Sequence, residues 1–251
     1  MDELPALDAL VVRMEKQLVL LAERGDPRRH FHDTYLRTTR AVRAELLGGG
    51  FSDTAWVERW DVAFADLYLD ALDADQRGGR PPGPWAVAFA AADAAALPPL
   101  RLILLGMNAH INYDLAQALL AVISDAEFDD AALLERRGAD HRHIDRVLAA
   151  LVDAKDPRSR AKFGAPSRLD RLLAPANRAA TKRFLAEARA KVWANTHVLA
   201  RARREGQTGY AERLAELERL ATARVADLTK PGQVLLELAA RGFGVLLDPD
   251  P

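Results

Sequence analysis

The sequence predicts an all-α protein, a single multi-helix bundle that ends in an antiparallel helical hairpin. Apolar residues recur at helical spacing along the whole chain, and glycine and proline motifs typical of helix ends separate these segments. No segment shows the sustained apolar–polar alternation of a strand. We expect one domain over residues 1–251, although a boundary could fall near 156–166. That boundary would divide a bundle (1–155) from the hairpin and a last helix (167–251).

The sequence pattern predicts five helices in the first half of the chain. The third should begin at a cap formed by Ser52, Asp53 or Thr54, because short polar side chains accept hydrogen bonds from the first free N–H groups of a helix. Its apolar stripe includes two tryptophans, and the Gly/Pro-rich loop 78–84 ends it. The other four helices should cover about residues 5–24, 29–47, 85–97 and 99–123.

The second half is marked less clearly. Two helices, near 127–137 and 140–154, should be separated at Gly138. Two long charged helices, about 176–205 and 210–228, should form the hairpin, with 206–209 as its connection. Asn195 and Thr196 lie on the inner stripe of this hairpin and predict a buried polar spot. A last apolar helix should follow the break at 230–232, before a short tail at 248–251.

The composition excludes several classes of function. Basic and acidic residues nearly cancel (35 and 36), and a nucleic-acid-binding surface needs clustered positive charge. Because the chain has no cysteine, thiolate catalysis, iron–sulfur clusters and cysteine-bound zinc are excluded. The acidic start does not match a signal peptide, and no apolar run is long enough for a membrane span. We therefore expect a cytoplasmic protein whose partner is a small molecule, and the oligomeric state stays open.

The predicted helix 99–123 is apolar almost all the way round, as expected of a central buried helix. It nevertheless carries four polar side chains within seven residues. At 100° per residue, His110 and Asp114 share one face, together with Gln117, whereas Asn108 and Asn112 lie nearly opposite. Buried polar groups are costly unless they are hydrogen-bonded, so both faces require partners.

His110 and Asp114 are the candidate catalytic residues. A carboxylate one turn from a histidine can fix the imidazole tautomer for acid–base chemistry, and the pair can also supply half of a metal site. The alternative is a buried polar network that only holds helices together, and spacing alone does not separate the two. Asn108 and Asn112 cannot act as acid or base, but they could orient a substrate.

Further candidates must come from other helices. His30 and His32 point about 200° apart on one helix and cannot both reach one metal, and His32 lies nearer the buried stripe. Asp61 follows a tryptophan and should be half-buried. The metal candidates are therefore His110, Asp114, Asp61 and His32, with Tyr35 as a candidate substrate-binding residue.

The run GMNAHINYDLAQAL (106–119) follows HFHDTYLRTTRAV (30–42) and WVERWDVAFADLYLDAL (56–72). Together these segments resemble a bacterial family known only as a domain of unknown function. The resemblance covers most of the first 155 residues, and it implies that the helix with Asn108, His110, Asn112 and Asp114 is the family's hallmark. It implies no activity.

The sequence lacks the motifs of phosphate-binding loops, dinucleotide-binding turns, serine hydrolases and zinc proteases. The leading hypothesis is an enzyme with a site centred on His110 and Asp114 inside the bundle, acting on a small, partly hydrophobic substrate. A divalent metal ion is a candidate cofactor, and the reaction type stays open. The alternative is a non-catalytic helical protein that binds a ligand or a partner and has a structural polar network.

Overall fold

A computed structural model describes residues 4–94, 97–153, 168–230 and 242–249. Within these ranges the regular secondary structure is entirely helical, which confirms the predicted all-α class. None of the helices described there is both long and apolar enough to cross a membrane. The candidate domain boundary at 156–166 lies outside the described residues, so the division into domains stays a prediction.

The helices follow the predicted order closely in the first half of the chain. Their bounds are α1 Pro5–Glu23, α2 Arg29–Leu47, α3 Thr54–Gln76, α4 Gly83–Ala94, α5 Pro99–Ala109, the π-helical turn η1 His110–Asp114, α6 Leu115–Val122, α7 Asp125–Asp129, α8 Ala131–Asp153, α10 Arg168–Glu205 and α11 Gln207–Thr229. The predicted cap of α3 is Asp53, whose side chain accepts a hydrogen bond from the Trp56 N–H at 2.9 Å.

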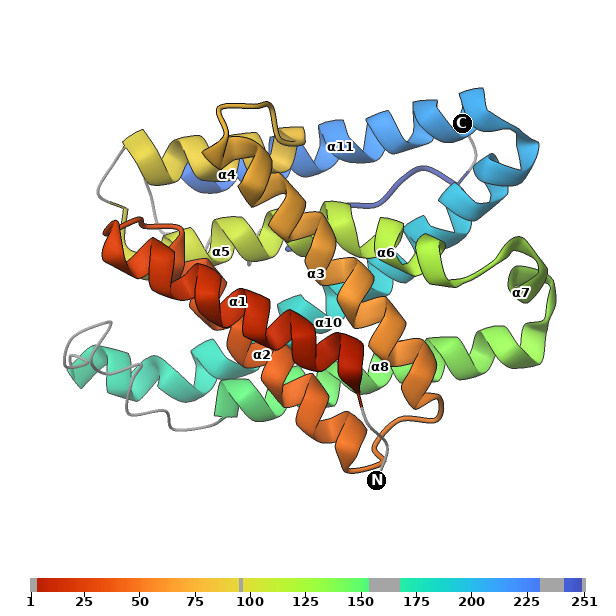
Figure 1. Ribbon diagram of the computed structural model, residues 1–251, viewed down its shortest axis with the longest axis horizontal. Helices are drawn as coiled ribbons and strands as arrows, with labels where there is room; N and C mark the ends of the chain where they lie inside the picture. Colours follow the sequence, from red (N-terminus) through yellow and green to blue (C-terminus); the bar gives the residue numbers. More distant parts are fainter. Residues whose placement is uncertain (1–3, 95–96, 154–167, 231–241, 250–251) are drawn as a thin grey trace.

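The continuous helix formed by α5, η1 and α6 runs through the middle of the molecule (Figure 1). Helices α4 and α11 cover it on one side, whereas α1, α2 and α8 lie on the other, and α3 crosses between the two groups. Contacts join this helix to α2, α3, α4, α10 and α11. Its surroundings therefore explain why the sequence of this helix is apolar on nearly every face.

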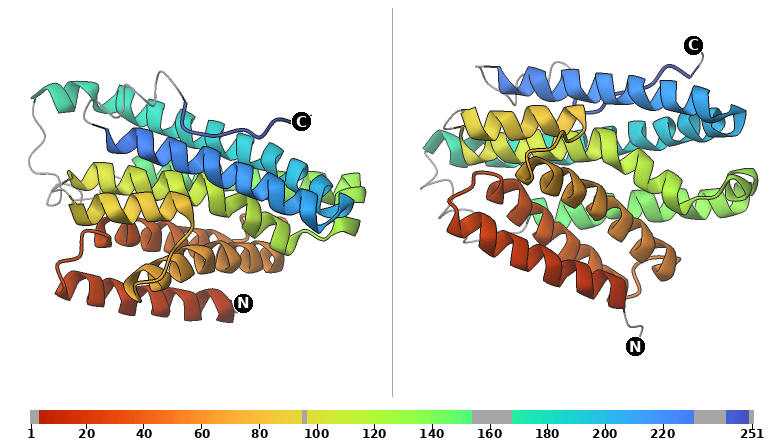
Figure 2. Two further views of the ribbon diagram at one scale, coloured as in Figure 1. Left: turned by 90° about the horizontal axis from the view of Figure 1, so that it is seen from above. Right: turned by 45° about the horizontal axis from the view of Figure 1, so that its top comes forward.

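Helices α10 and α11 form the predicted antiparallel hairpin (Figure 2). The connection is shorter than expected, because α11 already begins at Gln207 and Gly206 alone turns the chain. Gly206 has φ 141°, in the region that favours glycine. The hairpin packs on the central helix and on α4 and α8.

The predicted break at Gly138 is wrong, since α8 continues through it from Ala131 to Asp153. A Cβ atom at Gly138 would lie 3.3 Å from Trp193 Cζ2 of α10. The glycine therefore allows a bulky neighbouring side chain to approach the helix. The turn before it is a separate short helix, α7, with a capping box formed by Ser124 and Glu127.

Residues 231–241, in which the last predicted helix should begin, lie outside the described residues. Residues 242–249 are described and are not helical. They form an extended segment, which we call the C-terminal segment, beside the hairpin and the central helix (Figures 1 and 2). Phe243, Val245 and Leu247 are buried, so an apolar pattern that suggested a helix belongs here to an extended chain.

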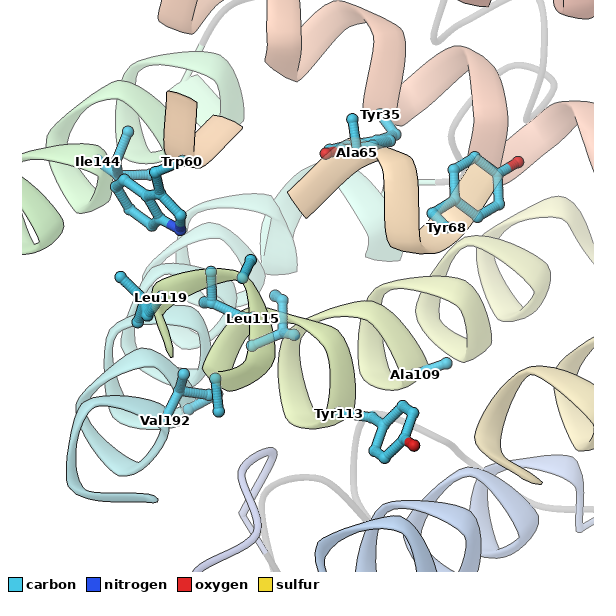
Figure 3. Close-up of a cluster of buried hydrophobic side chains, with 14 of the residues drawn as sticks. Tyr35, Trp60, Ala65, Tyr68, Ala109, Tyr113, Leu115, Leu119, Ile144 and Val192 are labelled. Atoms are coloured by element: carbon cyan, nitrogen blue, oxygen red, sulfur yellow. The ribbon is translucent and has the colours of Figure 1, made fainter. Parts of the chain in front are cut away.

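The core is continuous around the central helix (Figure 3). Tyr35 of α2 and Tyr68 of α3 lie on one side of it, and Leu115 and Leu119 of α6 face the hairpin residue Val192. Tyr113 points in the opposite direction, toward α11. The central helix thus separates an aromatic region between α2 and α3 from the side on which the hairpin packs.

Helix α5 and Phe31 of α2 approach each other closely in this core. A Cβ atom built on Gly106 would lie only 2.4 Å from Phe31 Cγ. The Phe31 ring cannot move aside easily, because the rings of Tyr68 and Trp85 lie 5.0 and 5.5 Å from it. Only glycine at position 106 fits the observed packing.

We expect Gly106→Ala to lower the free energy of unfolding by about 1–3 kcal/mol, because overpacking a tight core forces side chains from their preferred rotamers. Thermal or urea melts measure the change. The matched control is Gly209→Ala in α11, where the nearest atom to a new Cβ is 3.9 Å away. That variant should keep or slightly raise the stability. Equal stability of both variants would contradict the close approach at Gly106.

Candidate functional site

The central helix departs from α geometry at the hallmark residues. His110–Asp114 form a π-helical turn, in which the Leu115 N–H donates to the His110 carbonyl oxygen five residues back. Single π turns are rare and often mark functional sites. All five residues of the turn are buried. The extra residue also changes the register, and Gln117, expected on the face of His110, instead donates to the Tyr113 carbonyl oxygen at 3.0 Å.

His110 and Asp114 contact each other as predicted. His110 Nδ1 lies 2.8 Å from Asp114 Oδ2, and Trp85 Nε1 of α4 donates to the same oxygen at 2.8 Å. Two N–H donors on one carboxylate oxygen favour an ionised Asp114. In that state His110 carries its proton on Nδ1, which leaves the Nε2 lone pair open. Both side chains are almost fully buried.

Aromatic rings surround the imidazole of His110. Phe64 of α3 stacks on it with ring centroids 3.6 Å apart and planes within 3°. The Tyr35 ring meets it edge-on at 4.5 Å. His110 Nε2 itself is buried and has no hydrogen-bond partner among the described residues. The ring is therefore stacked on one face and hydrogen-bonded at Nδ1, while Nε2 is left available.

A cavity of about 80 Å³ lies against this ring between α2, α3, α5, α8 and α10. Most of its wall is aromatic or aliphatic. Besides His110, the lining residues Tyr35, Trp60 and Asp61 each have a buried polar atom without a partner in the described part of the chain. Thr34 is among the partly exposed residues at its edge. An apolar space with a few convergent polar atoms is typical of a small-molecule site.

Burial shifts the protonation equilibria of the pair in opposite directions. It lowers the pKa of His110 below its ordinary value of 6.5, and the bond to Asp114 only partly opposes this effect. Burial raises the pKa of Asp114, against the hydrogen bonds from His110 and Trp85. In both cases the cause is the cost of removing a charge from water. His110 is therefore neutral at pH 7 and can accept a proton at Nε2.

A second ionisable group lines the same cavity. Burial raises the pKa of Asp61 to about 7, and the nearby positive charge of Arg189 partly opposes the shift. Arg189 of α10 donates to Asp145 Oδ1 at 2.7 Å and to the His141 carbonyl oxygen at 2.6 Å. Its charge is thus already balanced by a carboxylate outside the cavity wall.

The structure brings some candidate residues together and separates others. His110, Asp61 and Tyr35 line one cavity, and Asp114 lies directly behind His110. His32 is buried elsewhere, and both its ring nitrogens are engaged, Nδ1 with the Tyr68 hydroxyl at 3.0 Å and Nε2 with the Met14 carbonyl oxygen at 2.8 Å. That histidine joins α1, α2 and α3.

The two asparagines of the hallmark face away from the cavity, as their spacing predicted. Asn108 Nδ2 and Asn112 Nδ2 both donate to the Phe243 carbonyl oxygen, at 3.2 and 3.0 Å. They therefore bind the C-terminal segment in this structure. Their role as substrate-binding residues stays a prediction that no contact with the cavity supports.

The four metal candidates do not form one ligand set. Among the described residues, no group of three or more histidine, aspartate or glutamate side chains is placed to hold a metal ion. His110 Nε2 and Asp61 Oδ2 are the two candidate atoms on the cavity wall that lack partners. Any metal there would need water or substrate oxygens to complete its coordination.

Three residues of the site were not singled out from the sequence. Trp85 donates to Asp114, Phe64 stacks on His110, and Arg189 lies on the cavity wall. Phe64 belongs to the third predicted helix, for which only two tryptophans of the apolar stripe were named from the sequence. Trp85 and Arg189 come from α4 and α10, far from the hallmark in sequence, and no local pattern around them predicts these contacts.

A protein-family model described as a family of unknown function (DUF5995) matches residues 7–231. The chain belongs to this family. The match extends through α10 and α11, well beyond the first 155 residues in which the resemblance was recognised. No curated protein and no solved structure matches the chain.

We expect ¹⁵N NMR of histidine-labelled protein to show His110 as a neutral imidazole with its proton on Nδ1. Its titration midpoint should lie below 6.5, because burial disfavours the charged ring. The His110→Gln variant assigns the resonance. His197, whose pKa is also lowered by partial burial, provides an internal comparison for the tautomer. A proton on Nε2 would contradict the proposed direction of the His110–Asp114 bond.

The raised pKa of Asp61 predicts a specific pH dependence of stability. Between about pH 4, where an unfolded aspartate titrates, and about pH 7 the folded state retains a proton that the unfolded state has lost. The free energy of unfolding should therefore fall as pH rises through this window. Asp61→Asn removes the effect, so its melting temperature should rise relative to the parent from pH 4.5 to 7.5. Asp70→Asn, an exposed aspartate of the same helix, is the control. A pH-independent difference for Asp61→Asn would contradict the raised pKa of Asp61 in the folded state.

Proposed function

We propose that this protein is an enzyme that binds a small, partly hydrophobic substrate in the cavity beside His110 and uses His110 as a general base. The observation that carries the proposal is the unpartnered Nε2 atom of a neutral histidine whose Nδ1 is bound by a buried carboxylate. The stacked Phe64 ring fixes the imidazole plane. This arrangement of base and orienting carboxylate is the one used for proton abstraction in many enzymes.

The polar atoms on the wall suggest which substrate fits. His110 Nε2 accepts a hydrogen bond, and the Tyr35 hydroxyl can accept one, whereas Trp60 Nε1 only donates. Asp61, with its pKa raised to about 7, accepts when it is ionised and donates when it is protonated. Arg189 is already paired with Asp145, so no positive charge is left over for an anion. The cavity therefore favours a neutral or cationic group that donates hydrogen bonds, such as a small alcohol or amine.

The volume limits the substrate further. At about 80 Å³ the cavity is smaller than the roughly 150 Å³ of an apolar cavity that admits benzene. The buried part of a substrate thus amounts to a few heavy atoms, and a larger molecule must extend past the partly exposed Thr34 and Met107. In the reaction, an O–H or N–H proton would pass to Nε2, and Asp114 would balance the positive charge on the ring.

The test combines ligand binding with two substitutions. Small alcohols and amines, with carboxylic acids of the same size as controls, are screened by thermal shift and by the His110 NMR signal. We expect alcohols or amines to bind the parent. His110→Ala and Asp114→Asn should fold with a modest loss of stability, because water can enter the cavity, and His110→Ala should bind about tenfold or more weakly, a loss typical of a missing charge-assisted or buried hydrogen bond. His197→Ala, at a histidine outside this cavity, should leave ligand binding unchanged.

Two outcomes would decide against the proposal. If both variants are strongly destabilised and the parent binds no ligand, the pair is a packing network. If the parent binds a ligand that remains chemically unchanged on long incubation, the protein is a non-catalytic binding protein. Elemental analysis of the purified protein tests the metal hypothesis separately, since a stoichiometric divalent ion would make His110 a ligand instead of a base.

A further inference from the structure

The C-terminal segment is held mainly through its main chain. Asn112 donates from Nδ2 to the Phe243 carbonyl oxygen at 3.0 Å and accepts the Val245 N–H at Oδ1, at 3.2 Å. Asn195 of α10 repeats this pattern two residues further on. It donates to the Val245 carbonyl oxygen at 3.1 Å and accepts the Leu247 N–H at 2.8 Å. Each carboxamide thus takes the place of a peptide group in a neighbouring strand.

Charged side chains complete this main-chain recognition. Glu187 Oε2 accepts the Phe243 N–H at 3.1 Å, and Lys191 Nζ donates to the Gly244 carbonyl oxygen at 3.2 Å. With Asn195, these two residues form a row along one side of α10. We call the full set the tail-binding surface, and it consists of Asn108, Asn112, Glu187, Lys191, Asn195, Arg201, Arg213 and Arg224.

The side chains of the segment give the surface its selectivity. Phe243, Val245 and Leu247 are buried, whereas Leu246 between them is 51% exposed. At Gly244 a Cβ atom would lie 2.8 Å from the Ala188 Cα atom, so a larger residue does not fit against the α10 backbone. The surface therefore accepts an extended segment of the pattern apolar–Gly–apolar–any–apolar.

We propose that the tail-binding surface is a peptide-binding site, and that residues 243–247 are its resident ligand, which the same segment presented by another chain can replace. Main-chain hydrogen bonds supplying affinity, with pockets for alternate side chains supplying specificity, are the usual features of sites that bind extended peptides. The peptide groups of the segment bond to side chains of α5, η1, α10 and α11, so the groups that recognise it belong to the helices and stay in place when the segment leaves. The proposal does not depend on the chemistry of His110.

Two neighbouring substitutions in the full-length chain test it. Val245→Asp places a carboxylate in a buried position and should release the segment, whereas Leu246→Asp changes an exposed residue and should not. Limited proteolysis followed by mass spectrometry measures the release. The probe is a fluorescent synthetic peptide with the sequence of residues 242–249, GFGVLLDP, measured by anisotropy.

We expect Val245→Asp to bind the peptide saturably. The parent and Leu246→Asp should bind at least about tenfold more weakly, because a tethered ligand competes at an effective concentration on the order of mM. A peptide with alanine in place of the residue corresponding to Gly244 should lose this binding. Gly244→Ala in the full-length chain is a second releasing variant, in case Val245→Asp does not fold by circular dichroism.

Three results would overturn the proposal. The first is a folded releasing variant that binds no added peptide. The second is equal binding by the parent and by Val245→Asp. The third is loss of folding in both Val245→Asp and Gly244→Ala, which would show that the segment is part of the core and not a ligand.

Discussion

A helix in the middle of a protein can carry polar side chains only if each of them finds a partner, and this constraint organises the structure around residues 108–114. An unpaired buried polar group costs about 1–3 kcal/mol, and a charged one costs more. On one face the need is met by Trp85 and by the His110–Asp114 bond. On the other it is met by the main chain of the C-terminal segment. Helix α4 and the C-terminal segment are thus bound by the polar groups of α5 and η1, and α10 is bound to the same segment through Asn195.

The partnering is nearly complete on the side of the C-terminal segment, where Asn108 Oδ1 is a buried atom without a partner among the described residues, and it is less complete toward the cavity. Asn112 uses both ends of its carboxamide, and Asn195 does the same for the next residues of the segment. Toward α2 and α3, by contrast, His110 Nε2 and Asp61 Oδ2 meet an open space. One larger apolar side chain on the wall would be enough to fill a space of 80 Å³. An aromatic wall around unsatisfied acceptors fits better with a ligand than with packing.

The sequence predicts those features that depend on local spacing. The i, i+4 relation between His110 and Asp114 directly predicted their contact, and the same periodicity separated Asn108 and Asn112 onto the opposite face. The helical class followed from periodicity along the chain. These predictions needed no information about how the helices are arranged.

Contacts between distant segments could not be predicted in this way. His32 was grouped with His110 as a metal candidate, yet its bonds run to Tyr68 and Met14. Gly138 was predicted to end a helix, because the sequence around it does not show that Trp193 of α10 packs closely against this position. The alternating apolar residues after Gly242 were assigned to a helix, whereas side chains from three other helices hold them extended. In each case a residue more than 15 positions away decides the local structure.

The π turn also limits how the family can vary in length. Each residue of an α-helix advances the chain by 100°. A π turn takes up one extra residue, so deleting one residue between His110 and Asp114 would restore regular α geometry and leave the orientation of α6 nearly unchanged. Leu115 and Leu119 would keep their places in the core, but the spacing of four residues that the His110–Asp114 hydrogen bond uses would fall to three. A gap of a single position in this turn would therefore alter the site while the core around α6 stays in place.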